Sequence, residues 1–280
     1  MGFFNRLTTG WVLGKQSLRL IWNDKTLLLF PVLSGSASLL YVAGIYFGIG
    51  PQKIAEIMRT VGEYGKSGDV PTVAVALALG LYFGLSFITV FFNVALVGCA
   101  RISMEERDSK LVDGLRVAFA HMGSILLWAL ISGTVGLLLG GLEKGKRSGG
   151  IVRAILGVAW SVMTYFVLPV MVVEKVNVFS SMGRSAKIIK QSWGEGLGAR
   201  FSIGWIVFLC MVPVILFFAL LPKGGEVAQF IPVLVAAYSA VVIVFTQAAK
   251  QVLTVVLYRY ATTKTIPTGF DQRDIQSAFL

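Results

Sequence analysis

The sequence predicts an all-α integral membrane protein with six transmembrane helices in three hairpins, each preceded by a cytoplasmic interfacial amphipathic helix. Composition is the first observation: 56% of the 280 residues are hydrophobic and only 14% are charged, whereas soluble domains have about 25% charged residues. The second is six apolar runs that reach the roughly 20 residues needed to cross a bilayer. The third is a basic segment with helical spacing of apolar residues before every other run. These observations exclude a soluble domain and a disordered chain.

The six apolar runs contain no acidic residue. They predict spans over 27–50, 70–100, 122–142, 151–173, 201–221 and 227–258. The second and sixth runs exceed one straight crossing, so we expect them to tilt or to continue as helix beyond the lipid. We predict one membrane domain made of three units and a cytoplasmic tail. Their bounds are 1–100, 101–173, 174–264 and 265–280.

Lysine and arginine residues indicate the orientation. Sixteen of the 25 lie in the N-terminal segment, the second and fourth loops and the C-terminal segment, and eight lie in the alternate loops. The positive-inside rule therefore places both termini in the cytoplasm, with a basic cluster in the third loop as the exception. Basic residues that border apolar runs favour anionic lipid headgroups as the partner of the +11 net charge. Nucleic acid is not expected, because its binders carry basic residues on a polar domain.

Three segments precede the odd-numbered spans and carry apolar residues at helical spacing. The first has Phe4, Leu7, Trp11, Leu18, Ile21 and Trp22. The second has Leu111, Leu115, Ala118 and Met122, with Asp113 as a cap, and the third has Phe179, Met182, Ala186, Ile189 and Trp193. Such helices lie in the interface plane with the apolar face in lipid and the basic groups at headgroups. The headgroup contacts are assigned to Arg19, Arg116, Lys187 and Lys190.

A six-residue pattern recurs in these segments. It reads Ser-Leu-Arg-Leu-Ile-Trp at 17–22, Gly-Leu-Arg-Val-Ala-Phe at 114–119 and Ser-Ala-Lys-Ile-Ile-Lys at 185–190. Its position before each hairpin favours three parallel units. The alternative is that any cytoplasmic loop leading into a span is basic and amphipathic.

Several motifs along the chain carry a family resemblance. They are Asn23-Asp24-Lys25 with Phe30-Pro31, the run from Trp128 to Gly136, Ala159-Trp160, the run from Pro169 to Glu174, Arg184-Ser-Ala186 and Trp193-Gly-Glu195. Together they resemble an uncharacterised family of prokaryotic six-span membrane proteins. The resemblance implies the fold class and a prokaryotic inner membrane, and it implies no activity.

Two sets of polar residues are candidate sites. Glu174 ends the fourth span and Arg184 lies in the following segment, so the two can form an interfacial ion pair; alternatively, Glu174 only marks where the helix enters water. The last span carries a polar stripe on one face: Gln247, Lys250, Gln251, Thr254 and Tyr258. An intramembrane lysine favours a water path or substrate site. Snorkelling of Lys250 to the inner interface is the alternative.

Glycine pairs four residues apart occur in three spans, at Gly44 and Gly48, Gly80 and Gly84, and Gly136 and Gly140. Such pairs allow helix backbones to approach closely and predict a compact bundle.

Catalytic groups are scarce. No acidic residue lies in a span and His121 is the only histidine, which argues against histidine metal sites and Ser-His-Asp triads. We predict a protein that is not an enzyme and needs no cofactor or metal. The leading hypothesis is an accessory or scaffolding subunit that contacts lipid headgroups and other membrane proteins or copies of itself. The alternatives are a small-solute transporter or channel using the polar stripe, and a lipid-handling protein with an acyl-sized groove opening sideways.

Overall fold

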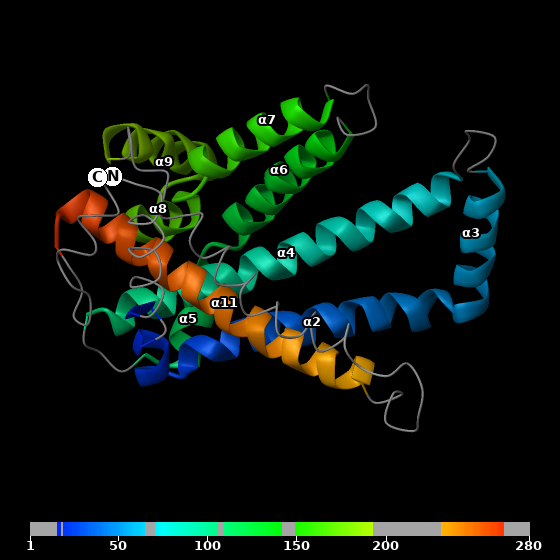
Figure 1. The fold of residues 1–280 in the computed structure, drawn as a ribbon, viewed down its shortest axis with the longest axis horizontal. Helices are drawn as coiled ribbons and strands as arrows, with labels where there is room; N and C mark the ends of the chain where they lie inside the picture. The colour runs from blue at the N-terminus through cyan, green and yellow to red at the C-terminus, as the bar shows by residue number, and fades with distance from the viewer. Residues whose placement is uncertain are drawn as a thin grey trace.

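The computed structural model describes residues 16–17, 19–64, 71–105, 109–141, 149–192 and 231–265, and its regular structure there is entirely helical (Figure 1). The helices are α2 (Thr26–Ile49), α3 (Pro51–Tyr64), α4 (Thr72–Ser103), α5 (Leu111–Ala120), α6 (Met122–Gly141), α7 (Gly149–Met163), α8 (Val167–Glu174), α9 (Val178–Ser192) and α11 (Ile231–Thr263). The predicted all-α class is confirmed.

Five stretches among the described residues are long and apolar enough to cross a membrane. They are Thr26–Ile49, Thr72–Ser103, Met122–Gly141, Val152–Glu174 and Tyr238–Thr263. These coincide with the first, second, third, fourth and sixth predicted spans, so the chain is a multi-pass membrane protein. The predicted span over 201–221 lies outside the described residues.

Helix α4 is the centre of the bundle, with α2, α5, α6, α8 and α11 packed against it (Figure 1). Its buried residues all lie in its second half, between Val90 and Ala100. We call the end of the bundle where α5, α8, α9 and the C-terminal part of α11 gather the core end. The opposite end, where α3 joins α2 to α4, is the α3 end (Figure 1).

Helix α3 lies where the sequence analysis expected only a loop. Gly50 ends α2 with a left-handed φ of 89° and donates its N–H to the carbonyl oxygen of Tyr46 at 3.1 Å. Pro51 then begins α3, because its fixed φ suits the first turn and its missing N–H needs no partner there. The Gly-Pro pair was the available signal for a helix end followed directly by a helix start.

The fourth span is interrupted, although the sequence analysis treated it as continuous. Helix α7 ends at Met163, a turn occupies 164–166, and α8 begins at Val167. Pro169 explains the break, because its ring clashes with the carbonyl four residues earlier and it lacks the N–H that would bond there. Two backbone groups left without a helical partner at the break are bound by Ser185 of α9, whose Oγ donates to the Met163 carbonyl at 2.7 Å and accepts from the Phe166 N–H at 3.0 Å.

The predicted lipid-facing stripe is wrong for α5, where it packs against the bundle, and is wrong in part for α9. In α5, Ala118 is fully buried and Leu111, Leu115 and Met122 pack against the core, while Asp113 caps the helix by accepting the Lys110 N–H at 3.2 Å. A small residue is the reason for the burial: a Cβ at Gly114 would lie 2.6 Å from the backbone oxygen of Ala95, so α5 approaches α4 too closely for lipid to intervene.

In α9 the buried face consists of Val178, Ser181, Ser185, Ile188 and Ile189. Of the predicted stripe, Ile189 is buried and Met182 packs against the core, whereas Phe179 is exposed. Trp193 and, in the first segment, Phe4, Leu7, Trp11 and Leu18 lie outside the described residues.

At two of the paired glycines, Gly84 and Gly136, an aromatic side chain lies over the position instead of a neighbouring backbone. The Tyr41 ring lies over Gly84 and its hydroxyl donates to the Gly80 carbonyl at 2.8 Å. Tyr82 does the same at α6, lying over Gly136 and donating to the Gly133 carbonyl at 3.2 Å. A methyl group added at Gly44, Gly48 or Gly140 would meet no atom of another described helix within 4 Å, so the predicted close helix approach does not occur there.

Candidate functional site

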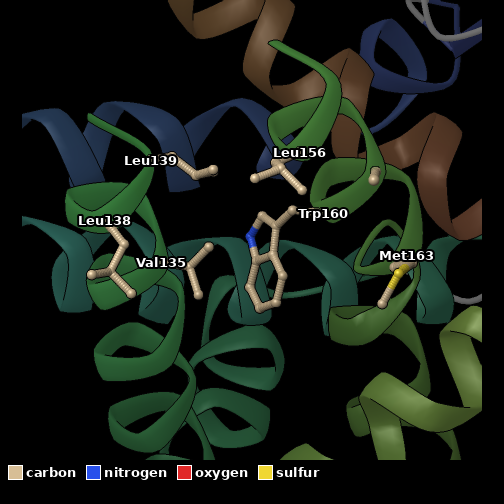
Figure 2. A pocket seen from close by; sticks show the side chains of 7 residues that line it. Val135, Leu138, Leu139, Leu156, Trp160 and Met163 are labelled. Atoms are coloured by element: carbon tan, nitrogen blue, oxygen red, sulfur yellow. The ribbon is translucent and has the colours of Figure 1, made fainter. Parts of the chain in front are cut away.

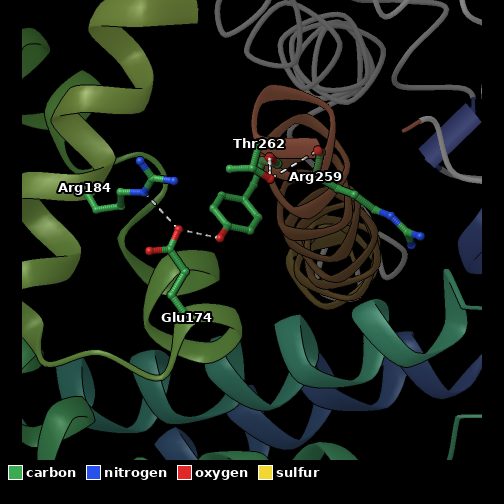
Figure 3. Close-up of polar contacts among 5 residues, drawn as sticks. Glu174, Arg184, Arg259 and Thr262 are labelled. Carbon is green, nitrogen blue, oxygen red and sulfur yellow. Dashed lines mark hydrogen bonds and ion pairs between the residues drawn. The ribbon is translucent and has the colours of Figure 1, made fainter. Parts of the chain in front are cut away.

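A carboxylate shared between two donors joins three helices at the core end (Figure 3). Oε1 of Glu174, the last residue of α8, accepts from Nε of Arg184 on α9 at 3.0 Å and from the hydroxyl of Tyr258 on α11 at 2.9 Å. The structure therefore brings together the pair expected from the sequence. It adds Tyr258, which had been placed in a separate polar stripe.

Local sequence brings α9 back alongside α8. Lys175 ends α8 in the left-handed region with a φ of 52°, a conformation in which the chain turns sharply. Asn177 then caps α9, because its Oδ1 accepts the Ser180 N–H at 2.8 Å. The short connection places Arg184, in the second turn of α9, beside the carboxylate that ends α8.

The predicted polar stripe does not form one continuous site. Lys250 is exposed and Gln247 and Gln251 are half-buried, whereas Thr254 and Tyr258 are buried. Thr254 donates to the Lys250 carbonyl at 2.7 Å within the same helix. Only Tyr258 is joined to a charged side chain of another helix by the contacts described above.

A cavity of about 390 Å³ lies next to Tyr258, where α4, α8 and α11 end. Two arginines, one glutamate and three threonines supply most of its polar lining: Arg101, Arg259, Glu105, Thr262, Thr263 and Thr265. Met104, Val173 and Val255 supply its apolar walls. This volume falls within the range of about 300–1,000 Å³ typical of ligand pockets. No pattern in the sequence marks the cavity, because its lining comes from residues 101–105, 173 and 255–265, which no local spacing brings together.

The four residues assigned to headgroups, Arg19, Arg116, Lys187 and Lys190, are all exposed. Arg116 also lies 3.9 Å from Asp113, one turn earlier in α5. Three aromatic side chains of the same segments, Trp22, Phe119 and Phe179, are between 61% and 67% exposed. Trp22 and Phe119 each follow an arginine by three residues, so one helical turn carries both groups on the same face.

The recurring six-residue pattern has a matching pattern of burial. Its first residue is buried in all three copies (Ser17, Gly114, Ser185), and so is its fifth (Ile21, Ala118, Ile189). Its third residue, always Arg or Lys, and its sixth are exposed in all three copies. The three segments therefore present the same face to the bundle, which favours the parallel-unit interpretation.

An apolar groove of about 440 Å³ runs between α6 and α7 (Figure 2). Val135, Leu138 and Leu139 face Leu156, Trp160 and Met163 across it, and the Trp160 ring points into the space between the helices. Trp160 also stacks on Trp128 of α6, with ring centroids 6.0 Å apart and planes 16° apart. The groove lies between residues of two candidate membrane spans.

Comparison with known protein families gives a match over most of the described helices. The model of the family of unknown function DUF6159 matches residues 72–269. The chain belongs to this family. No curated protein and no solved structure matches it. The DUF6159 match confirms the predicted membership of an uncharacterised family. It extends from α4 through α11 and includes Glu174, Arg184, Tyr258 and every residue that lines the cavity.

Residues that carried the resemblance to the family hold helices together in the structure. Asp24, which precedes the DUF6159 match, accepts the Thr26 N–H at 3.1 Å and the Ser109 hydroxyl, and so ties the start of α2 to the segment before α5. Phe30 is fully buried against Gly114. Ser109 gave no signal in the sequence, because a loop serine has no periodicity to mark its partner.

Proposed function

We propose that this DUF6159 protein is a non-enzymatic accessory or scaffolding subunit of the prokaryotic inner membrane, with its core end in the cytoplasm and in contact with anionic headgroups. One observation carries the proposal: exposed Trp22, Phe119 and Phe179 lie on the same short segments as the exposed basic residues. Aromatic side chains and basic side chains at one depth are typical of a cytoplasmic membrane interface.

Rigidity at the core end supports a scaffolding role. Helices α5 and α9 are packed into the bundle, so the backbone segments that carry their basic side chains are held in place. The polar side chains beneath them bond to one another or to backbone groups, as Glu174 and Ser185 do. Such contacts hold helices in place and need no cofactor. Exposed apolar faces of the spans are available to lipid, to other membrane proteins or to a second copy.

Extraction of the full-length protein with its surrounding lipid in styrene–maleic acid copolymer tests the proposal. Each Lys or Arg near the surface is worth about 1 kcal/mol of attraction to anionic lipid, so we expect a several-fold enrichment of anionic lipid over the bulk membrane. Replacing Arg19, Arg116, Lys187 and Lys190 by Gln should remove it. The matched control, Lys53→Gln with Arg59→Gln on α3, should not. The proposal would be overturned if the co-extracted lipid had the composition of the bulk membrane and chemical crosslinking recovered neither a partner protein nor a second copy.

Small-solute transport is a second candidate, favoured by the interrupted fourth span. Transporters use such breaks to expose backbone groups to substrate, whereas Ser185 binds both groups here. Conductance of planar bilayers in KCl distinguishes the two: currents above the protein-free level that change in Lys250→Met would favour transport. Their absence would leave the scaffolding proposal as the better account.

A further inference from the structure

We propose that the cavity between the ends of α4, α8 and α11 binds the phosphodiester group of one membrane phospholipid. The inference rests on the lipid contact proposed above, but it concerns a single built site instead of a charged surface. Its residues are not those assigned to the headgroup surface. Three features argue for it: the depth of the cavity, its guanidinium groups and its charge balance.

The depth of the cavity matches that of lipid phosphates. Three candidate spans end around it, at Ser103, Glu174 and Thr263. The lining residues come from the last turns of these spans and the residues just beyond, from Arg101 to Glu105 and from Val255 to Thr265, with Val173 between them. A span ends where the hydrocarbon core gives way to headgroups, so the cavity lies at headgroup level.

Two guanidinium groups are placed there with hydrogen-bonding capacity to spare. Arg259 donates from Nη1 to the Met104 carbonyl at 3.3 Å and from Nε to the Thr265 hydroxyl at 3.4 Å. Arg101 approaches Glu105 through Nε at 3.5 Å. Within the described part of the chain, no partner is assigned to Nη2 of Arg259 or to either Nη of Arg101. Guanidinium forks match phosphate oxygens in geometry and charge.

The Glu174 carboxylate does not compete for these arginines. Figure 3 shows Arg184 reaching Glu174 on one side of α11, while the Arg259 side chain extends away from them on the other side. Because Arg184 and Tyr258 already bind Oε1, the negative charge of Glu174 is compensated outside the cavity. Tyr258 thus separates the ion pair from the cavity that it also lines.

Charge balance selects the kind of phosphate. Helix C-termini carry a partial negative charge of about half a unit each, and α4, α8 and α11 all end here, next to Glu105. Arg101 and Arg259 bring two positive charges against these three partial charges and the Glu105 carboxylate, so the site is close to neutral and has no positive excess to hold a second negative charge on a ligand. A phosphodiester carries one negative charge and suits such a site, whereas a dianionic phosphate monoester would meet repulsion. The apolar walls formed by Met104, Val173 and Val255 suit the glycerol and first acyl carbons of a lipid.

Native mass spectrometry of the delipidated full-length protein, titrated with phosphatidylglycerol of defined chain length, tests the proposal. We expect one tightly retained lipid per chain. Arg101→Gln combined with Arg259→Gln should weaken its retention at least tenfold, as expected for the loss of a charged hydrogen bond. The control pair Lys53→Gln with Arg59→Gln, exposed on α3 at the opposite end of the bundle, should retain it. Glycerol 3-phosphate at equal concentration should not displace it.

Arg101→Gln alone keeps the proposal testable if the double variant does not fold. The Arg101 side chain is 43% exposed and its ion pair with Glu105 spans only four residues of chain. Its removal should therefore leave thermal unfolding unchanged and weaken lipid retention about threefold to fivefold. Unchanged retention in this variant and in the double variant would overturn the site. Equal loss in the control pair would also overturn it, as would displacement by glycerol 3-phosphate.

The two proposals fail separately. A tight lipid that is lost only in the arginine variants, with no enrichment of surrounding anionic lipid, would support the site and contradict the headgroup surface. Enrichment with no tightly retained lipid would support the surface and contradict the site.

Discussion

At the core end, α2 buries Leu27 and Phe30 completely, whereas toward the α3 end the same helix exposes Leu39, Leu40 and Phe47. Helix α4 shows the same gradient, with Val94 to Ala100 buried and Val73 exposed. The side-chain hydrogen bonds of Glu174, Asp24 and Ser185 also lie toward the core end. The core end is therefore held by side-chain packing and hydrogen bonds within the protein.

The α3 end depends on the bilayer instead. Apolar side chains that face lipid lose nothing by exposure, because lipid tails are as apolar as the residues themselves. The contacts there are few, such as the Tyr41 ring over Gly84. One continuous helix therefore serves as a core element at one end and as a lipid-facing element at the other. Variants matched between the two ends measure the difference.

The largest expected effect comes from phenylalanines at the two ends of α2. Phe30→Ala removes a ring that is 0% exposed, and the cavity left behind should lower the free energy of unfolding by about 3–5 kcal/mol. Phe47→Ala removes a ring that is 75% exposed and should change it by less than about 0.5 kcal/mol. Titration with sodium dodecyl sulfate from mixed micelles measures both. Equal losses would show that the α3 end is also a packed core.

Glycine substitutions give the next largest difference. A Cβ at Gly114 would lie 2.5 Å from Cζ of Phe30 as well as against the Ala95 oxygen, so Gly114→Ala should destabilise by about 1–3 kcal/mol. A Cβ at Gly44, toward the α3 end of α2, would meet no other described helix within 4 Å, and Gly44→Ala should stabilise the helix by up to about 1 kcal/mol. The same titration measures both variants. A neutral Gly114→Ala would mean that α5 moves freely away from α4.

The break in the fourth span gives a third, smaller effect. Ser185→Ala leaves the Met163 carbonyl and the Phe166 N–H without their side-chain partner, which should cost about 1–3 kcal/mol. Ser180→Ala, an exposed position on the same helix, is the control and should be neutral. Thermal unfolding in detergent compares the two. If Ser185→Ala unfolds like the control, water or another group replaces the serine and the break does not depend on α9.

Much of this architecture was accessible from the sequence, because apolar runs and basic loops report directly on spans. The pairing of Glu174 with Arg184 was also accessible, since ten residues of sequence separate them. Burial of α5 and α9 could not be predicted, because an amphipathic helix has the same sequence pattern whether its apolar face contacts lipid or protein. Gly114 was the one sequence signal of the close approach of α5 to α4. The break at 164–166 was marked by Pro169, whose effect in a span depends on whether a neighbour such as Ser185 binds the freed groups.

Removal of one hydroxyl at each end gives the smallest and sharpest comparison. The Tyr258 hydroxyl donates to a carboxylate at 2.9 Å, and the Tyr41 hydroxyl donates to the neutral Gly80 carbonyl at 2.8 Å. Since hydrogen bonds to charged groups are the stronger kind, Tyr258→Phe should cost about 1.5 kcal/mol and Tyr41→Phe about 0.5 kcal/mol. Adding Arg184→Gln to each variant completes the test by detergent titration. The free energy of unfolding lost through Arg184→Gln should change in the Tyr258→Phe background, because both residues share Glu174. It should stay the same in the Tyr41→Phe background. Additivity in both backgrounds would mean that the Glu174 carboxylate does not couple α9 to α11.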